Sequence, residues 1–160
     1  MEKKTECLLA VCTGKTVPLS AVPDEVFAQG ILGEGIAIEP AEGRFCAPVG
    51  GKIESVADTR HAFTILSDAG NDVLVHIGVD TVSLAGEGFV SHVLTGESVK
   101  AGQLIAEADI DFIRSRGLSA ICSVVVTEPE KIENIEYKPG ACVGGKNAIM
   151  CYCVAERSMR

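Results

Sequence analysis

The feature that most constrains this sequence is its division into short runs of apolar and β-branched residues bounded by Gly, Pro, Asn or Asp. Runs of about four to seven residues are typical of strands, because helices in globular proteins are usually longer. Seventeen glycines are available for the intervening turns. Many short strands joined by frequent turns predict an all-β fold, either an antiparallel β-sandwich or a barrel.

The candidate strands are spread over the whole chain. We expect strands at residues 6–12, 35–39, 44–47, 52–56, 62–66, 72–77, 88–93, 104–107, 121–127, 134–137 and 148–154. One short helix is expected after Asp109, which can cap it, and Gly117 can take the left-handed conformation that ends it. A weaker helical turn is expected over residues 24–29. The sequence therefore predicts an all-β fold with one or two short helices.

Charge and hydropathy narrow the possible partners. The chain has 14 Lys and Arg against 22 Asp and Glu, a formal net charge of −8. Binding to a phosphate backbone needs clustered basic residues, so nucleic acid is not expected as a partner. No apolar run is long enough to span a membrane and no signal peptide begins the chain, so we expect a cytoplasmic protein without membrane insertion.

Seven cysteines raise the question of a disulfide framework. The count is odd and no Cys-x-x-Cys pair occurs, which favours reduced thiols that act as small core hydrophobes. Cys151 and Cys153 are two residues apart, so both point to one face of a strand, a poor geometry for clamping a metal.

Residues 61–77 contain the most informative pattern, two strand-like runs around a turn-rich segment, which predicts a β-hairpin. With the turn centred between Asp68 and Ala69, His61 lies directly opposite His76. Directly opposed residues have Cβ atoms about 4.5–5.5 Å apart, so the two imidazoles are expected to meet.

The same register assigns the two faces of the hairpin. The core face is expected to consist of Ala62, Thr64, Leu66, Val73, Val75 and Ile77. On the other face, Phe63, Ile65 and Leu74 would form an apolar rim around the histidines. A compact exposed apolar patch usually marks a docking site.

Two interpretations of the histidine pair follow from spacing alone. Either both are ordinary histidines, one of them buried and hydrogen-bonded, or they carry out phosphoryl transfer. In the second case, a neutral imidazole that donates one N–H to a backbone carbonyl keeps its other nitrogen free as a nucleophile. The neighbouring ring can then stabilise the charge on the transferring group.

Six segments resemble one known family and keep its order from about residue 15 to 154. They are Val22–Phe27, Gly33–Pro40, Ala47–Gly51, Thr59–Phe63, Leu74–Val82 and Gly86–Phe89. The family is the glucose-type IIA component of the bacterial phosphoenolpyruvate-dependent sugar phosphotransferase system. The resemblance implies one such domain over residues 1–160, with residues 1–14 partly a lead-in, and an antiparallel β-sandwich of the barrel-sandwich hybrid type with a duplicated motif.

The resemblance also implies a reaction. His76 would accept a phosphoryl group on Nε2 from the phosphocarrier HPr and pass it to a cysteine of the IIB domain of a sugar permease. His61 would stabilise the phosphoryl group, and Thr59 would orient His61. The implied protein is a monomeric phosphotransferase component that forms phosphohistidine and needs no cofactor.

Several residues are expected to bind the partners. By the resemblance, Asp80 and Asp24 would meet basic groups on the phosphocarrier. The apolar residues expected at the interface are Phe27, Phe63, Leu74 and Val79. His92 matches no position of the family and is expected on the surface.

A zinc-dependent metallopeptidase of a related β fold is the alternative, because His76 and Asp80 form a His-x-x-x-Asp pair. Such a site needs a third protein ligand, and the sequence has no downstream His-x-His to supply it. We therefore expect no intrinsic metal, although His61 and His76 could share an ion with a partner's carboxylate at an interface.

Overall fold

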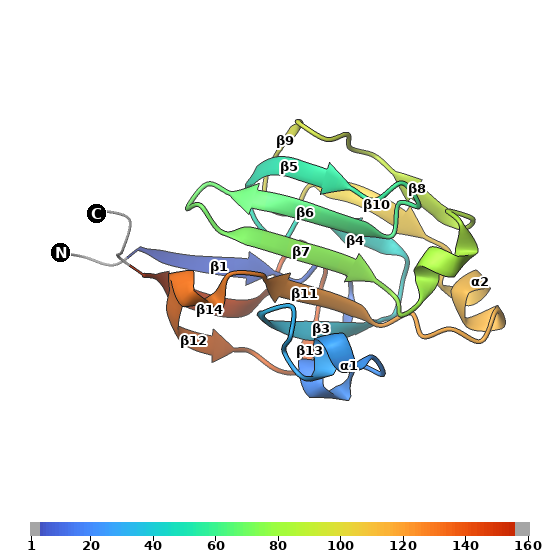
Figure 1. Cartoon of the computed structure of the whole chain (residues 1–160), viewed down its shortest axis with the longest axis horizontal. Helices are drawn as coiled ribbons and strands as arrows, with labels where there is room; N and C mark the ends of the chain where they lie inside the picture. The colour runs from blue at the N-terminus through green and yellow to red at the C-terminus, as the bar shows by residue number, and fades with distance from the viewer. Residues whose placement is uncertain (1–3, 156–160) are drawn as a thin grey trace.

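The computed structural model describes residues 4–155, which form three antiparallel sheets (Figure 1). The largest sheet contains, in spatial order, β13 (Ala141–Cys142), β2 (Gly14–Pro18), β3 (Glu34–Pro40), β11 (Cys122–Val126), β7 (Asp72–Ile77), β6 (Ala62–Ser67), β5 (Gly51–Val56) and β9 (Ser98–Val99). The second sheet contains β4 (Arg44–Cys46), β10 (Leu104–Ala108) and β8 (Phe89–Ser91). The third contains β1 (Thr5–Leu9), β14 (Ala148–Val154) and β12 (Ile132–Tyr137).

Helical structure is limited to short elements at the ends of strands. These are η1 (Leu19–Ala21), α1 (Glu25–Ala28), η2 (Thr81–Leu84), α2 (Ile110–Ser115) and η3 (Pro129–Lys131). The two expected helices are confirmed as α1 and α2. Asp109 caps α2 by accepting a hydrogen bond from the Phe112 N–H, and Gly117 follows with a φ of 78°. The antiparallel all-β class is likewise confirmed, and no sheet closes into a barrel within residues 4–155.

The main core lies between the large sheet and the two small sheets. Alternate residues of β6 and β7 are fully buried in it, which follows from the period of two in a strand. A second, smaller cluster lies at α1 and η1 and consists of Val22, Phe27, Ala37, Val79, Ile121 and Val125. This second cluster matters for function because it packs beside His76, as the ring contact of Phe27 shows.

The β6–β7 hairpin forms, but its register differs by one residue from the expected one. Ala62, not His61, lies opposite His76. The loop has three residues instead of two, because Gly70 takes a φ of 93° and the Ser67 N–H bonds to the carbonyl of Asn71. Three-residue hairpin loops with a left-handed third residue are a common alternative to two-residue turns.

The shift in register corrects the two faces of the hairpin. The buried apolar residues of β6 are Phe63 and Ile65, both fully buried, whereas Leu66 is exposed. The expectation that Phe63 and Ile65 form an exposed rim is therefore wrong. Phe63 faces the main core and cannot contact a partner protein.

The cysteines also differ in part from expectation. Cys12, Cys122 and Cys142 are buried, as expected of core thiols. Cys7 and Cys151, in contrast, form a disulfide between β1 and β14, so the expectation of seven reduced core cysteines is wrong.

Candidate functional site

The two histidines meet at the end of the hairpin opposite its turn. His76 is the penultimate residue of β7, and His61 immediately precedes β6. Their ring centroids are 4.9 Å apart and the ring planes are almost perpendicular, at 85°. The expected meeting of the two imidazoles therefore occurs, although the register that predicted it was off by one residue.

The local backbone explains how His61 reaches His76. Its carbonyl accepts a hydrogen bond of 2.7 Å from the Ile77 N–H, which continues the ladder one residue beyond β6. Just before it, Arg60 has a φ of 59°, so the chain turns sharply there. Because this turn reverses the direction of the chain, the His61 side chain is placed by the loop as well as by the strand.

Arg60 holds that loop in place. Its guanidinium donates to the carbonyl oxygens of Gly86 and Phe89, at 3.1 and 3.2 Å. The Phe89 ring then lies edge-on to His61, with centroids 6.5 Å apart. Arg60 could not be predicted as part of the site, because a positive φ at a non-glycine residue leaves no clear pattern in the sequence.

The environment of His76 fixes its tautomer. Nδ1 lies 2.9 Å from the carbonyl oxygen of Gly78. A carbonyl oxygen only accepts hydrogen bonds, so Nδ1 carries the proton of the neutral ring and Nε2 carries the free lone pair. Gly78 has a φ of 80°, and a Cβ at this position would collide with Thr81, so this tight turn requires glycine.

Thr59 lies within hydrogen-bond distance of the His61 ring. The Thr59 Oγ1 lies 2.6 Å from Nδ1 of His61. When the hydroxyl donates to Nδ1, the proton of the neutral His61 ring is on Nε2, which makes that nitrogen a hydrogen-bond donor. The two rings then offer complementary groups, a lone pair on His76 and an N–H on His61.

Both imidazoles are neutral near pH 7. Burial, together with the neighbouring His76, lowers the pKa of His61 to about 4. Burial also lowers the pKa of His76, although the Gly78 carbonyl and the carboxylates of Asp24 and Asp80 act in the opposite direction. Desolvation therefore outweighs the two nearby negative charges, and the neutral form of His76 is the dominant one.

The two acidic residues proposed for partner binding flank His76. Asp24 caps α1 through a hydrogen bond of 2.9 Å from the Val26 N–H, and Asp80 is exposed with a φ of 60° at the start of η2. Their influence on the pKa of His76 places both carboxylates within electrostatic reach of the ring. A basic partner surface would therefore meet negative charge on two sides of His76.

The apolar residues proposed for partner binding are less exposed than expected. Phe27 and Val79 are buried, and the Phe27 ring packs on His76 with centroids 5.0 Å apart. Leu74 is half-buried against the same cluster. On the two short helical elements nearest His76 in sequence and contact, the exposed apolar residues are instead Val26 of α1, 41% exposed, and Val82 of η2, 57% exposed. Neither residue was predicted, because both lie in helical turns and follow no strand alternation.

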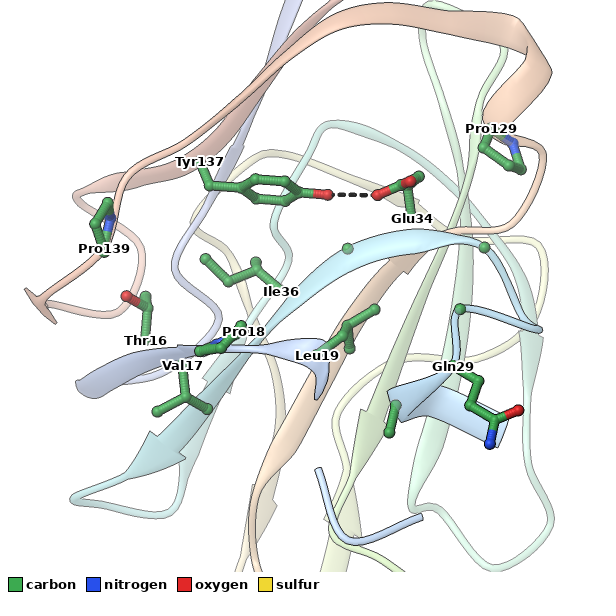
Figure 2. Close-up of a pocket in the computed structure, with 14 residues that line it drawn as sticks. Thr16, Val17, Pro18, Leu19, Gln29, Glu34, Ile36, Pro129, Tyr137 and Pro139 are labelled. Carbon is green, nitrogen blue, oxygen red and sulfur yellow. Dashed lines mark hydrogen bonds between the residues drawn. The ribbon is translucent and has the colours of Figure 1, made fainter. Parts of the chain in front are cut away.

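A separate cavity of about 650 Å³ lies on another part of the molecule (Figure 2). Its walls come from β2, η1, the end of α1, β3 and the segment around β12, with Val17, Leu19 and Ile36 among the lining residues. The Tyr137 hydroxyl donates to the Glu34 carboxylate across it, at 2.7 Å. Neither histidine lines this cavity, so it is distinct from the site at the end of the hairpin.

The described residues do not supply the donor set that a zinc peptidase requires. Within residues 4–155, no three His, Cys, Asp or Glu side chains are arranged to hold a metal ion. His92 is exposed, as expected, and its Nε2 lies 2.7 Å from the Glu107 carboxylate. The same part of the chain contains no helix long and apolar enough to cross a bilayer.

Comparison with known proteins points to one family. Residues 6–132 match the family model described as phosphoenolpyruvate-dependent sugar phosphotransferase system, EIIA 1. Among solved structures, the chain is similar to a glucose permease IIA from Mycoplasma capricolum, with 34% sequence identity and a TM-score of 0.88. That match covers 92% of this chain and 96% of the other.

Proposed function

Since this chain belongs to the glucose-type EIIA family of the phosphoenolpyruvate-dependent sugar phosphotransferase system, and is therefore a phosphoryl-carrying phosphotransferase component, we propose that Nε2 of His76 is the atom that carries the phosphoryl group. The donor is the phosphocarrier HPr, and the acceptor is a cysteine in the IIB domain of a sugar permease. The observation that carries this proposal is the bond between Nδ1 of His76 and the Gly78 carbonyl, because it leaves Nε2 with its lone pair.

The transfer consists of two in-line substitutions at phosphorus. In the first, the Nε2 lone pair of His76 forms a bond to phosphorus while the bond from phosphorus to the HPr histidine breaks. In the second, the cysteine thiolate of the IIB domain bonds to phosphorus and the bond to Nε2 breaks. The Gly78 carbonyl stabilises the phosphorylated ring in between, because Nδ1 keeps its proton and continues to donate.

His61 is proposed to stabilise the transferring group. Its ring is 4.9 Å from that of His76, and Thr59 orients it so that Nε2–H can donate to a phosphoryl oxygen. A preorganised donor in a partly buried site contributes more than the same donor in water, because the surroundings need no reorganisation during the reaction. The low pKa of His61 favours this neutral donor over an imidazolium that would titrate near pH 7.

The test is transfer from phospho-HPr to the purified chain in a single turnover. We expect one phosphoryl group per chain, located on His76 by mass spectrometry, and none in His76→Ala. His61→Gln keeps the nucleophile, so it should form the phosphoprotein about 10² to 10³ times more slowly, the loss typical of one transition-state donor. His92→Gln is the matched control, because His92 is exposed and bonded to Glu107.

Two results would refute the proposal. Phosphate on His92 or on a serine would remove His76 as the acceptor. Phosphorylation of His76→Ala on His61 would show that the two histidines have the opposite roles. Onward transfer to an isolated IIB domain, measured with the same variants, tests the second half-reaction separately.

A further inference from the structure

The disulfide between Cys7 and Cys151 lies outside the histidine site, because it joins β1 to β14. It links β1 to β14 across 144 residues of sequence, which ties the two ends of the described chain together (Figure 1). We propose that this disulfide is a reversible redox site, opened and closed by low-molecular-weight thiols and their disulfides, that controls how firmly β1 is held on the protein.

The disulfide lies on the solvent side of the sheet. Cys7 is exposed and Cys151 is half-buried, whereas the adjacent Leu8, Met150 and Tyr152 face the core and are almost completely buried. A thiolate attacks a disulfide by reaching one of its sulfur atoms, so exposure of Cys7 permits exchange without unfolding.

The sheet keeps the two cysteines adjacent in either redox state. Cys7 and Cys151 are directly opposed, with Cα atoms 4.1 Å apart. This spacing is typical of a non-hydrogen-bonded antiparallel pair, in which no ladder hydrogen bond joins the two residues. The flanking pairs, Glu6 with Tyr152 and Leu8 with Met150, belong to the strand ladder and not to the disulfide. After reduction β1 therefore opens more often but re-pairs in the same register, which returns the two thiols to a position where the bond can close again.

The other cysteines are poorly suited to this chemistry. Burial raises the pKa of four thiols, which suppresses the thiolate that exchange requires; these are Cys12, Cys46, Cys122 and Cys142. Cys153 is half-buried on the same face as Cys151, but it lies opposite Thr5 and not opposite a cysteine. Cys153 therefore serves as a natural control within the same strand.

Opening the disulfide has a structural consequence through Glu6. β1 is an edge strand paired only with β14, so the disulfide is a covalent brace on an element that would otherwise fray. From this strand, Oε1 of Glu6 accepts hydrogen bonds from the side chains of Ser67, Asn71 and Tyr152. Ser67 and Asn71 form the base of the β6–β7 turn, so the redox state of β1 acts on the hairpin that carries His76.

The exchange balances without any further reactant. A thiolate such as that of glutathione attacks Sγ of Cys7, forms a mixed disulfide and releases Cys151 as a thiolate, which takes up a proton. A second glutathione thiolate attacks the glutathione sulfur of the mixed disulfide and releases Cys7 as a thiolate, which takes up a proton. The protein gains two hydrogens, and two glutathione molecules become one glutathione disulfide; the reverse reaction closes the bond.

The experiment uses the full chain without denaturant, in buffers of reduced glutathione or glutathione disulfide. Alkylation and mass spectrometry should find Cys7 and Cys151 modified only after reduction. Hydrogen exchange of the β1 amides should accelerate at least about tenfold on reduction, while the amides of the central strand β11 keep their protection. Cys153→Ser should retain this difference, and Cys7→Ser should exchange rapidly in both buffers.

Three outcomes would overturn the proposal. Equal alkylation of Cys7 and Cys151 in both buffers would mean that the bond does not form. A bond that survives reduced glutathione until denaturant is added would be a permanent structural disulfide. Unchanged exchange of the β1 amides on reduction would separate the disulfide from the anchoring of the strand.

Discussion

Replacing His61 with glutamine should make the folded protein less sensitive to acid. His61 is 7% exposed, and burial beside His76 lowers the pKa of its ring from 6.5 to about 4. Below pH 6.5 the unfolded chain therefore binds a proton at His61 that the folded protein excludes. This difference lowers the free energy of unfolding as the pH falls from about 6.5 to 4, and it is constant below that range.

The size of the effect follows from those two pKa values. With an unfolded pKa of 6.5 and a folded pKa of about 4, His61 lowers the free energy of unfolding by about 2 kcal/mol between pH 7 and pH 5. Carboxylates and His76 also titrate in this range, but they are present in both proteins. The difference between wild type and His61→Gln isolates the contribution of His61.

Urea unfolding at pH 7 and pH 5, at one salt concentration, measures this difference. Between pH 7 and pH 5, the free energy of unfolding should fall by about 2 kcal/mol more in wild type than in His61→Gln. His92→Gln should behave as wild type, because an exposed histidine paired with Glu107 contributes little to stability. Equal losses in wild type and His61→Gln would refute the reasoning, because His61 would then titrate similarly in the folded and unfolded states.

Three further predictions concern Glu6, Asp80 and the effect of a chelator. Glu6→Leu should lower the free energy of unfolding by about 3 kcal/mol or more, because the buried donors of Tyr152, Asn71 and Ser67 lose their acceptor. Glu6→Gln should lower it by less than half as much, and equal losses for the two variants in urea unfolding would contradict this prediction. Asp80→Asn keeps a residue type that tolerates the φ of 60° at this position. The variant should associate with a basic phosphocarrier more slowly than wild type at low salt, and the difference between the two rates should shrink as salt rises. Equal stopped-flow rates at low salt would remove Asp80 from the interface. A chelator should leave the rate of phosphoryl acceptance unchanged, and a rate that falls on chelation and returns with added zinc would restore the peptidase-like site as a candidate.

Elements with local signals could be predicted from the sequence. For α2, the cap at Asp109 and the glycine at 117 are both local, and the structure places both as expected. β2 and β13 were not predicted, since β2 contains Lys15 and Pro18 without clear alternation and β13 has only two residues. Such strands exist because neighbouring strands pair with them, which is information that lies elsewhere in the chain.

The register of the β6–β7 hairpin could not be predicted from the sequence, for a different reason. Both faces of residues 61–77 carry apolar side chains, so hydrophobic alternation does not distinguish a two-residue loop from a three-residue loop. The choice depends on Gly70 taking a φ of 93°, and Asp68, Ala69 and Gly70 together allow either loop. A shift of one residue is enough to move Phe63 from the proposed docking face to the core.

The prediction that His61 meets His76 holds despite the wrong register, because both histidines lie where the β6–β7 ladder ends. His61 stands outside β6, after the left-handed residue Arg60, and His76 is followed by the left-handed residues Gly78 and Asp80. These backbone turns bring the two rings together, turn the Gly78 carbonyl onto Nδ1 of His76 and expose Asp80 beside it. Residues in such conformations are uncommon outside glycine and persist only where the surroundings hold them, here through the hydrogen bonds from Arg60 to Gly86 and Phe89. The chemistry of the site is therefore set by the turns that end the two strands, while the hairpin between them fixes only the distance at which those turns face each other.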